Sequence, residues 1–243
     1  MNRTHNTVLV TGGGTGIGLA VTEQLIHSEN QVIICGRREE PLLAAKERFP
    51  SLHIRRCNVS DPDARQDLVD WITAEFPLNI LVNNAGIQRK VDFREGLRDM
   101  DQADEEVAIN LIAPIHLSAL LIPHLRKQPQ AAIVNVSSGL AFTPLAAVPV
   151  YCATKAAMHS LSLTMRHQLR GTSVRVFEVA PPMVATGLSG DRNRPEDDGS
   201  YMSPEAVARG IMEALAQDVY EVALGPAVGL HQQREALFGA LNG

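Results

Sequence analysis

Tyr151 and Lys155 are the residues of this sequence whose types and spacing most directly suggest acid–base chemistry. Positions four apart lie on one face of a helix, so a helix here would bring the phenol and the ammonium together. A phenol has an ordinary pKa of about 10 and needs help to exchange protons near neutral pH. Because a neighbouring positive charge favours the phenolate, the sequence predicts that Lys155 lowers the pKa of Tyr151 and makes it a usable proton donor.

A glycine-rich turn, TGGGTGIG at 11–18, directly follows the first apolar run. It lacks the G-x-G-x-x-G spacing, because Ile17 and Leu19 stand where the third glycine would fall, and instead follows T-G-x-x-x-G-x-G. Glycines let a backbone turn tightly and approach a pyrophosphate, whose charge would face the N-terminus of a helix beginning near Gly16. The turn therefore predicts a dinucleotide site.

The second apolar run ends in CGRR, which bears on the choice of dinucleotide. NAD sites usually place a carboxylate on the ribose 2′-hydroxyl about 20 residues past the glycine turn, whereas an arginine accommodates a 2′-phosphate. Gly36 stands at the place of the acid, and Arg37 and Arg38 follow it. The sequence favours NADP(H) over NAD(H). The alternative is that Glu39 or Glu40 reaches the ribose.

Short apolar runs alternate with longer amphipathic ones along the chain, a pattern typical of a parallel sheet covered by helices on both faces. The fold class expected is a doubly wound, Rossmann-like α/β sandwich of three layers, built as one domain over 1–243. Its ligand should lie at the carboxyl ends of the strands. The strands are expected at 7–11, 31–35, 52–57, 79–83, 131–138, 173–180 and 220–224. The helices are expected at 16–28, 39–49, 61–75, 101–127, 150–170 and 203–217.

Two helix starts and one late loop have clear local signals. Asp61-Pro62 and Ser203-Pro204 each place a capping residue before a proline at the first helical position. The polar stretch at 187–200 predicts a mobile loop, placed where a lid would order over cofactor and substrate. Only one helix and one strand are expected after it.

Further motifs occur in a fixed order along the chain: NNAG at 83–86, an asparagine at 110, a serine pair at 137–138 and Y-x-x-x-K at 151–155. Together with the glycine turn, they make the chain resemble the short-chain dehydrogenase/reductase family over essentially its whole length. The length is similar to the short form of that family. One departure is Pro182, which stands where the family usually has glycine and restricts the backbone.

The resemblance implies an NADP(H)-dependent oxidoreductase, a carbonyl reductase in the broad sense, that transfers a hydride between C4 of a nicotinamide and a ketone, aldehyde or secondary alcohol. Tyr151 would be the general acid/base, and Lys155 would assist it and bind the nicotinamide ribose. Ser138 would bond the substrate oxygen, because strand alternation turns Ser137 to the other side. Asn110 would hold a water that links Lys155 to solvent.

The resemblance also implies a set of cofactor contacts. Thr15 could add a hydroxyl to the 2′-phosphate, Asn58 and Val59 would meet adenine, and Val184 and Thr186 would meet the nicotinamide amide. Asn83 would instead tie strands together. The implied cofactor residues are Gly12, Gly14, Thr15, Gly16, Ile17, Gly18, Arg37, Arg38, Asn58, Val59, Asn84, Ala85, Gly86, Tyr151, Lys155, Pro181, Val184 and Thr186.

Composition and charge exclude several other classes of function. The formal net charge is −5, which disfavours nucleic acid as a partner. The first apolar run is too short for a signal-peptide core, and no apolar run approaches the ~18 residues that a membrane span needs, so a cytoplasmic protein is expected. The three cysteines form no C-x-x-C pair and the histidines no H-E-x-x-H motif, so no metal site is expected.

Substrate and assembly are less well determined by the sequence. A small carbonyl or alcohol is the expected partner, and the apolar face of 111–125 is compatible with a homo-oligomer, a dimer or tetramer. His159 is interpreted as a subunit contact and Cys152 as a structural thiol. The pocket would be lined by Leu140, Phe142, Val148 and Met183, with Gln88 and Arg89 at its mouth.

Two other functions stay open on the same scaffold. One is a non-catalytic protein that senses NADP(H), which would keep the glycine turn but not need the acid–base set. The other is a non-redox epimerase or dehydratase with a tightly held cofactor, which would show no net consumption of NADPH.

Overall fold

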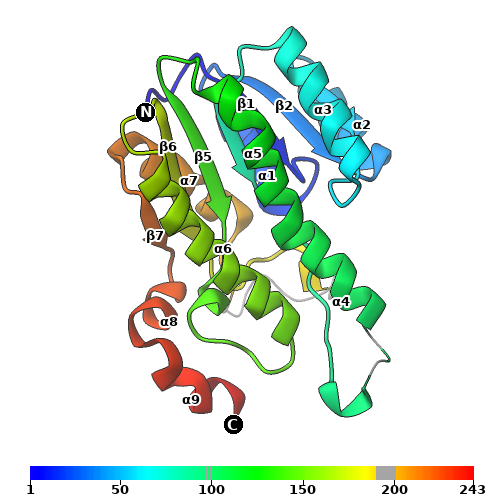
Figure 1. The fold of residues 1–243 in the computed structure, drawn as a ribbon, viewed down its shortest axis with the longest axis vertical. Coiled ribbons are helices and arrows are strands. Elements are labelled where there is room, and N and C mark those ends of the chain that lie inside the picture. Colours follow the sequence, from blue (N-terminus) through cyan, green and yellow to red (C-terminus); the bar gives the residue numbers. More distant parts are fainter. Residues whose placement is uncertain (97, 99, 190–200) are drawn as a thin grey trace.

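A single seven-stranded parallel sheet runs through the computed structural model, which describes residues 1–96, 98, 100–189 and 201–243. The strand order is β3-β2-β1-β4-β5-β6-β7, so the direction of winding reverses between β1 and β4 (Figure 1). This confirms the predicted doubly wound fold. The strands are β1 (Thr7–Thr11), β2 (Gln31–Gly36), β3 (His53–Arg56), β4 (Ile80–Asn83), β5 (Ala131–Val136), β6 (Val174–Ala180) and β7 (Glu221–Ala223).

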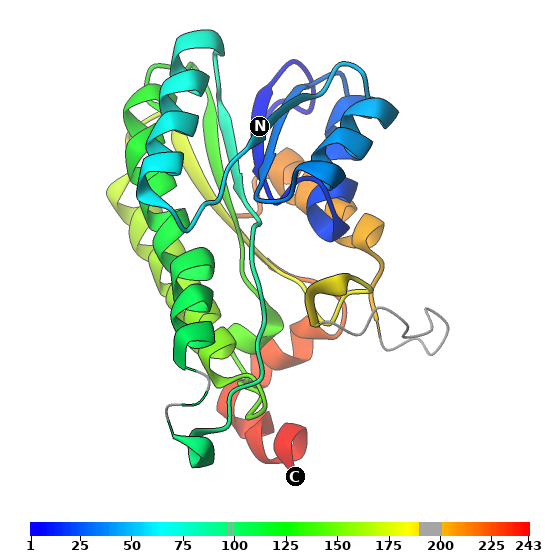
Figure 2. The same ribbon diagram turned by 90° about the vertical axis from the view of Figure 1, so that its right-hand side faces the viewer.

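Helices cover both faces of the sheet, which makes three layers (Figure 2). One face carries α1 (Gly16–His27), α2 (Glu39–Arg48) and α7 (Pro204–Gln217), and the other carries α3 (Pro62–Glu75), α5 (Ala113–Leu125) and α6 (Pro149–Gln168). Val8 and Val10 of β1 pack into the first layer, and Leu9 between them packs into the second. Strands buried on both faces are mostly apolar, which explains their long hydrophobic runs.

The two predicted helix caps are both formed. Asp61 Oδ1 accepts a hydrogen bond from the backbone N–H of Asp63 at 2.9 Å, and Ser203 Oγ accepts one from Ala206 at 3.2 Å. Each satisfies a backbone donor that the first turn of a helix leaves without an intrahelical partner.

The helix expected at 101–127 is a composite. It consists of α4 (Met100–Val107), a π-helical turn η2 (Ala108–Ile112) and α5. The continuous stretch Met100–Leu125 has 26 residues and contains an 18-residue window with a mean hydropathy of 1.6, long and apolar enough to cross a membrane. The expectation that no apolar run approaches the length of a membrane span was therefore wrong. Packing also explains this apolarity, because Leu117, Leu121 and Leu125 are at most 1% exposed.

The chain after the loop at 187–200 holds more structure than predicted. Beyond α7 and β7 it forms α8 (Ala227–Gln233), the 3-10 turn η6 (Arg234–Leu237) and α9 (Phe238–Asn242). These elements are too short to show a clear helical period, and they depend on distant partners: Thr143 Oγ1 donates to the carbonyls of Leu230 at 3.1 Å and Arg234 at 2.9 Å. Of the predicted lid, only 187–189 lie within the described residues, as the turn η4 (Gly187–Ser189).

Exposed apolar side chains occur on the helices for which self-association was expected. Ile112 is 38% exposed and Leu163 is 44% exposed. The dimer or tetramer stays a prediction.

A buried polar ladder ties β4, β5 and α6 together. Asn83 Nδ2 donates to Asn135 Oδ1 at 2.9 Å, and Asn135 Nδ2 donates to Ser162 Oγ at 2.9 Å. All three residues are at most 4% exposed. The expectation that Asn83 links strands is confirmed, and the ladder also fixes the position of α6 on the sheet.

The substitution Asn135→Ala should therefore destabilise the protein. Removing this side chain leaves the amide of Asn83 and the hydroxyl of Ser162 without their shared partner, which costs about 1–3 kcal/mol of unfolding free energy. Urea denaturation measures the change. Because the residues form one network, the double variant with Asn83→Ala should lose less than the sum of the two single losses; strict additivity would contradict the ladder.

Candidate active site

The predicted acid–base residues meet beside the carboxyl end of β5. Ser138 follows that strand, and α6 lies across it with Tyr151 and Lys155 on its buried face. All three residues are buried, with 5–7% of their surface exposed. The ammonium of Lys155 lies 5.5 Å from the centroid of the Tyr151 ring and donates a hydrogen bond to the Val136 carbonyl at 2.8 Å.

The two serines after β5 have different surroundings. Ser137 is 1% exposed, and its hydroxyl donates to the Val179 carbonyl at 3.5 Å. Ser138 Oγ accepts from the backbone N–H of Leu140 at 3.1 Å and also hydrogen-bonds Tyr151. The serine chosen from the alternation is thus the one beside the tyrosine.

Burial dominates the electrostatics of the tyrosine–lysine pair. It raises the pKa of Tyr151 above its ordinary value, against the opposite effect of the hydrogen bond with Ser138. It lowers the pKa of Lys155 to about 8, although Glu106 and Glu178 act to raise it. The sequence predicted that Lys155 lowers the pKa of Tyr151. This prediction was wrong, because desolvation of the phenol raises its pKa by more than the surrounding protein groups lower it.

Glu106 is a member of this site that the sequence reasoning missed. It lies on α4, is 0% exposed, and accepts a hydrogen bond from the backbone N–H of Arg89 at 3.1 Å. Burial raises the pKa of this carboxyl to about 7, and Lys155 interacts with it electrostatically. The signal available in the sequence was its position four residues before Asn110, which places both on one helix face.

Asn110 joins two parts of the site. It lies in the π-helical turn η2, where its Oδ1 accepts from the N–H of Ile87 at 2.9 Å and its Nδ2 donates to the carbonyl of Ile87 at 2.8 Å. The same Nδ2 donates to Thr154 Oγ1 on α6 at 3.4 Å. Asn110 thus anchors the chain after NNAG to the helix that carries the acid–base pair. Its predicted role in holding a water stays a prediction.

The glycine turn connects β1 to α1 through positions that tolerate no side chain. Gly12 has a φ of +67°, and a Cβ there would lie 3.0 Å from Ala85 Cα. A Cβ on Gly18 would lie 2.2 Å from the Gly12 carbonyl oxygen. The glycines allow the turn, the first helical turn and the NNAG segment to pack closely.

The first turn of α1 suits an anion. Thr15 is its N-cap residue but makes no side-chain cap hydrogen bond, in contrast to the caps of α3 and α7. The first backbone N–H groups of a helix have no intrahelical partner, and the helix dipole favours negative charge at this end. The residues at 15–18 therefore fit the pyrophosphate of a dinucleotide.

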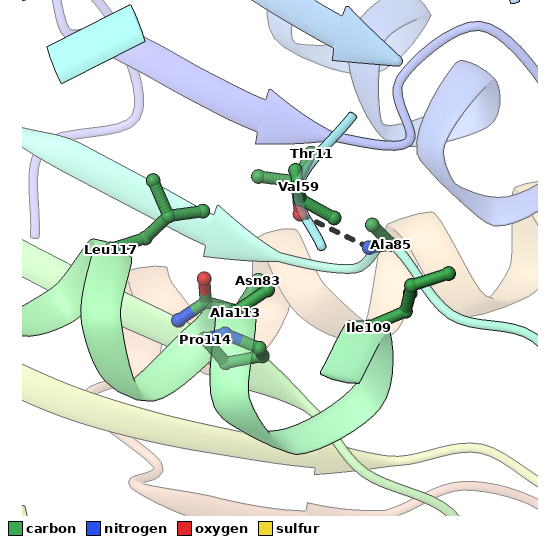
Figure 3. Close-up of a pocket in the computed structure, with 8 residues that line it drawn as sticks. All are labelled: Thr11, Val59, Asn83, Ala85, Ile109, Ala113, Pro114 and Leu117. Carbon is green, nitrogen blue, oxygen red and sulfur yellow. Dashed lines mark hydrogen bonds between the residues drawn. The ribbon is translucent and has the colours of Figure 1, made fainter. Parts of the chain in front are cut away.

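Thr11 holds the NNAG segment against the glycine turn, a role that the sequence reasoning did not assign. Its Oγ1 accepts from the backbone N–H groups of Asn84 and Ala85, both at 3.0 Å, and Asn84 Nδ2 donates to its carbonyl at 2.9 Å. Figure 3 shows Thr11, Val59 and Ala85 around a narrow gap with the Ala85 hydrogen bond drawn. The gap is too small for a water molecule, so these residues pack beneath the site.

Basic residues gather at the carboxyl ends of β2 and β3. Arg37 pairs with Glu105 Oε1 at 2.6 Å, while Arg38 is exposed and has no ion-pair partner among the described residues. Arg56, which is paired with Gly36 in the sheet register, donates its Nε hydrogen to the Arg37 carbonyl at 3.3 Å. Arg56 was not among the predicted residues, because only the register of β3 brings it here.

The remaining predicted cofactor residues lie on two further loops. Pro181 accepts from the N–H of Gly139 at 2.9 Å, and Val184 bridges to Met202. Thr186 approaches the glycine turn, since a Cβ on Gly16 would lie 3.0 Å from its Cγ2. Asn58 is exposed, with its Oδ1 accepting from the Ser60 hydroxyl at 2.9 Å.

The predicted substrate pocket is only partly assembled. Val148 and Leu140 pack beside Tyr151, and Met183 is 56% exposed. Phe142 is instead buried against the rings of His159 and His231, so its interpretation as a pocket residue was wrong. His159 makes these contacts within the chain, and its interpretation as a subunit contact stays a prediction.

The predicted structural role of the cysteines agrees with their positions. Cys35, Cys57 and Cys152 are buried free thiols. Cys152 Sγ accepts from the N–H of Leu145 at 3.3 Å, which gives it a structural contact beside Tyr151.

Comparison with known proteins identifies a family. A model described as short chain dehydrogenase matches residues 6–197. "Uncharacterized oxidoreductase DltE" of Bacillus subtilis (strain 168) is 48% identical and covers 99% of this chain and 96% of its own length. "NADP-dependent 3-hydroxy acid dehydrogenase YdfG" of Escherichia coli O6:H1 is 28% identical and covers 90% of each chain.

Solved structures show the same fold. A short chain dehydrogenase/reductase from Burkholderia phymatum in complex with NAD has a TM-score of 0.87 at 22% identity, covering 100% of this chain and 97% of its own. A short chain dehydrogenase from Burkholderia cenocepacia J2315 in complex with NADP has a TM-score of 0.86 at 24% identity, covering 99% of each chain.

Burial of Glu106 predicts a specific pH dependence of stability. The folded-state pKa of about 7 lies above the ordinary 4.5, so this group contributes stability that is complete below pH 4.5 and lost as the pH rises through 7. Glutamine does not ionise, so Glu106→Gln does not lose this stability as the pH rises. The unfolding free energy of the variant minus that of the unmodified protein should therefore increase by up to about 3 kcal/mol between pH 5 and pH 8. Glu105→Gln, which changes a half-buried neighbour that pairs with Arg37, is the control. Parallel stability curves for Glu106→Gln and the unmodified protein would contradict the burial of a titrating carboxyl.

Proposed function

The chain belongs to the short-chain dehydrogenase family, and from this premise we propose that it is an NADP(H)-dependent oxidoreductase that interconverts a small ketone or aldehyde and the corresponding alcohol. The observation that carries the proposal is the burial of Tyr151, Lys155 and Ser138 together beside the carboxyl end of β5. An acid–base pair shielded from water at the ligand-binding edge of a doubly wound sheet suits proton transfer to a carbonyl oxygen.

The residues of the chain divide the chemistry among them. A bound nicotinamide would supply or accept the hydride. Ser138 donates a hydrogen bond to the carbonyl oxygen, and Tyr151 gives its proton to the alkoxide as it forms. The raised pKa of Tyr151 keeps the phenol protonated at neutral pH, the state that reduction requires. Alcohol oxidation uses the same groups in reverse.

Lys155 and Glu106 can resupply that proton. Their pKa values of about 8 and about 7 lie close to neutral pH, so both groups can gain and lose protons under the conditions of turnover. Asn110 is a positioning residue in this scheme, because its side chain is occupied by Ile87 and Thr154.

Charge at the ends of β2 and β3 supports NADP(H) as the cofactor. Arg38 is exposed and without an ion-pair partner in the described part of the chain, and Arg37 and Arg56 lie beside it. Guanidinium groups bind phosphate strongly, and a 2′-phosphate would compete with Glu105 for Arg37. The E. coli relative is named as NADP-dependent. Solved structures of this fold hold either NAD or NADP, so the preference for NADP(H) is inferred from these arginines.

A panel of ketones, aldehydes and secondary alcohols, assayed in parallel with NADPH and NADH or their oxidised forms, tests the proposal as a whole. Turnover with the phosphorylated dinucleotide is expected. A cofactor-sensing protein would bind NADPH without consuming it in any assay, and an epimerase or dehydratase would convert its substrate with no net change in NADPH.

Replacing the proposed acid gives a sharper prediction. Tyr151→Phe should lower turnover by about 10²–10⁴-fold, because the phenol is the proton donor, while NADPH binding measured by titration calorimetry stays within a few-fold. Tyr220→Phe makes the same chemical change on a tyrosine outside the site and should keep full activity. Turnover of Tyr151→Phe close to that of the control would refute the role of Tyr151.

Gly36 offers a direct test of cofactor choice. A Cβ at this position would meet its nearest neighbour, Leu42 Cδ2, at 3.6 Å, so aspartate fits without a clash at Cβ. Its carboxylate would repel a 2′-phosphate and accept hydrogen bonds from a free ribose hydroxyl. Gly36→Asp should therefore change the NADPH to NADH ratio of kcat/KM in favour of NADH by about tenfold or more, and Gly36→Ala, which adds no charge, should leave it nearly unchanged. An unchanged ratio in Gly36→Asp would show that another part of the site reads the 2′ position.

A further inference from the structure

Four ionisable side chains from four separate elements meet on one face of the sheet, next to the active site but facing away from the glycine turn. They are His159 of α6, Glu178 of β6, Glu221 of β7 and His231 of α8. Glu178 and Glu221 are partners in the parallel register of β6 and β7, so their side chains project from the same face. The packing of α6 and α8 adds a histidine beside each carboxylate.

The distances within this group are short. His159 Nδ1 lies 2.8 Å from Glu178 Oε2, and His231 Nε2 lies 2.9 Å from Glu221 Oε1. One nitrogen of His159 and one oxygen from each glutamate all lie within 4.8 Å of one another. The three donor atoms therefore converge on a common point.

Glu178 is the member that calls for an explanation. It is 0% exposed, and its Oε1 has no hydrogen-bond partner within the described part of the chain. A buried carboxylate with an unpaired oxygen is costly unless a cation is held against it. A second carboxylate in register with it increases that cost through repulsion.

The surrounding protein groups neutralise the pair only in part. Lys155 interacts electrostatically with Glu178, but its hydrogen bond goes to the Val136 carbonyl and not to a carboxylate. Arg166 Nη1 is 3.8 Å from Glu221 Oε2, but its other nitrogens donate to the carbonyls of Val176 at 3.0 Å and Tyr220 at 2.7 Å. The ring of Phe142 packs edge to face against both imidazoles, with centroids 4.8 Å from His159 and 4.5 Å from His231. This packing orients the two histidines as a ligand set requires.

We propose that His159, Glu178 and Glu221 bind a divalent transition-metal ion of the zinc class, with His231 holding Glu221 in place or serving as a fourth ligand. One imidazole nitrogen and two carboxylate oxygens form a mixed N/O set, which suits zinc better than magnesium or calcium. The donor atoms lie within 4.8 Å of one another, and ligand bonds of about 2.0–2.2 Å require them to move closer together as the ion binds.

Such an ion would have a structural role. It would tie α8, and with it the C-terminal segment at 227–242, to α6 and the edge of the sheet. The sequence predicted no metal site because it holds no C-x-x-C or H-E-x-x-H motif. The ligands proposed here come from separate elements, which only the tertiary fold brings together.

Zinc binding to the full-length protein tests the proposal. Protein treated with a chelator and dialysed should bind Zn²⁺ in titration calorimetry with one ion per chain, confirmed by metal analysis, and its melting temperature should rise with Zn²⁺. Substituting Co²⁺ should give the visible absorption of a site with nitrogen and oxygen ligands. Neither readout depends on enzymatic activity, so the result is independent of the proposed function.

Variants locate the site. Glu178→Gln and Glu221→Gln should each weaken Zn²⁺ binding by about 100-fold or more, whereas His167→Asn, an exposed histidine on the same helix as His159, should bind as the unmodified protein does. Because Glu221 lies on the edge strand and is partly exposed, that variant tests the site even if Glu178→Gln fails to fold. No stoichiometric binding, or equal binding in folded Glu221→Gln, would overturn the proposal and leave the group as a pair of histidine–glutamate ion pairs.

Discussion

A lysine ammonium held almost out of water is the constraint around which the active site is arranged. Lys155 is 5% exposed, and its one hydrogen bond among the described residues goes to the carbonyl of Val136. Burial lowers its pKa, the charges of Glu106 and Glu178 counter that effect, and the resulting value of about 8 lies in the range useful for proton transfer at neutral pH. Desolvation and the two buried carboxylates thus have opposite effects on the pKa of Lys155. The resulting pKa requires α6 to lie in a fixed position on β5.

The fold supplies that position through long-range polar contacts. The ladder from Asn83 through Asn135 to Ser162 fixes α6 on the sheet, and Asn110 links the same helix to the chain after NNAG. At the first strand, Thr11 holds NNAG to the glycine turn. The two halves meet where the winding of the sheet reverses, between β1 and β4, which is where doubly wound folds bind their ligands. The helix that carries the proton donor and the anion-binding turn are therefore each hydrogen-bonded to the chain at 84–87.

Sequence reasoning predicted the features that depend on local pattern. All seven strands and five of the six predicted helices occur close to their predicted bounds, and the sixth is divided among α4, η2 and α5. These features were predictable because apolar periodicity, glycine turns and caps depend on residues close together in the sequence. It missed Glu106, Arg56 and the group around Glu178, because these side chains reach their partners only when elements distant in the sequence pack together. It also misjudged the effect of Lys155 on Tyr151, because a spacing of four residues says nothing about how strongly both groups are desolvated. The elements α8 and α9 escaped prediction because their stability comes from contacts with the chain near Gly139 and Thr143.

Isotope tracing tests whether the buried pair completes a hydride transfer from NADPH to a carbonyl. NADPH carrying deuterium at both C4 positions of the nicotinamide would be incubated with a carbonyl compound that the protein reduces, in ordinary water. The account predicts that the alcohol carries one deuterium on its carbinol carbon and that turnover or kcat/KM is slower than with unlabelled NADPH if hydride transfer limits the rate. An alcohol without deuterium, or a product formed without oxidation of NADPH, would contradict the account.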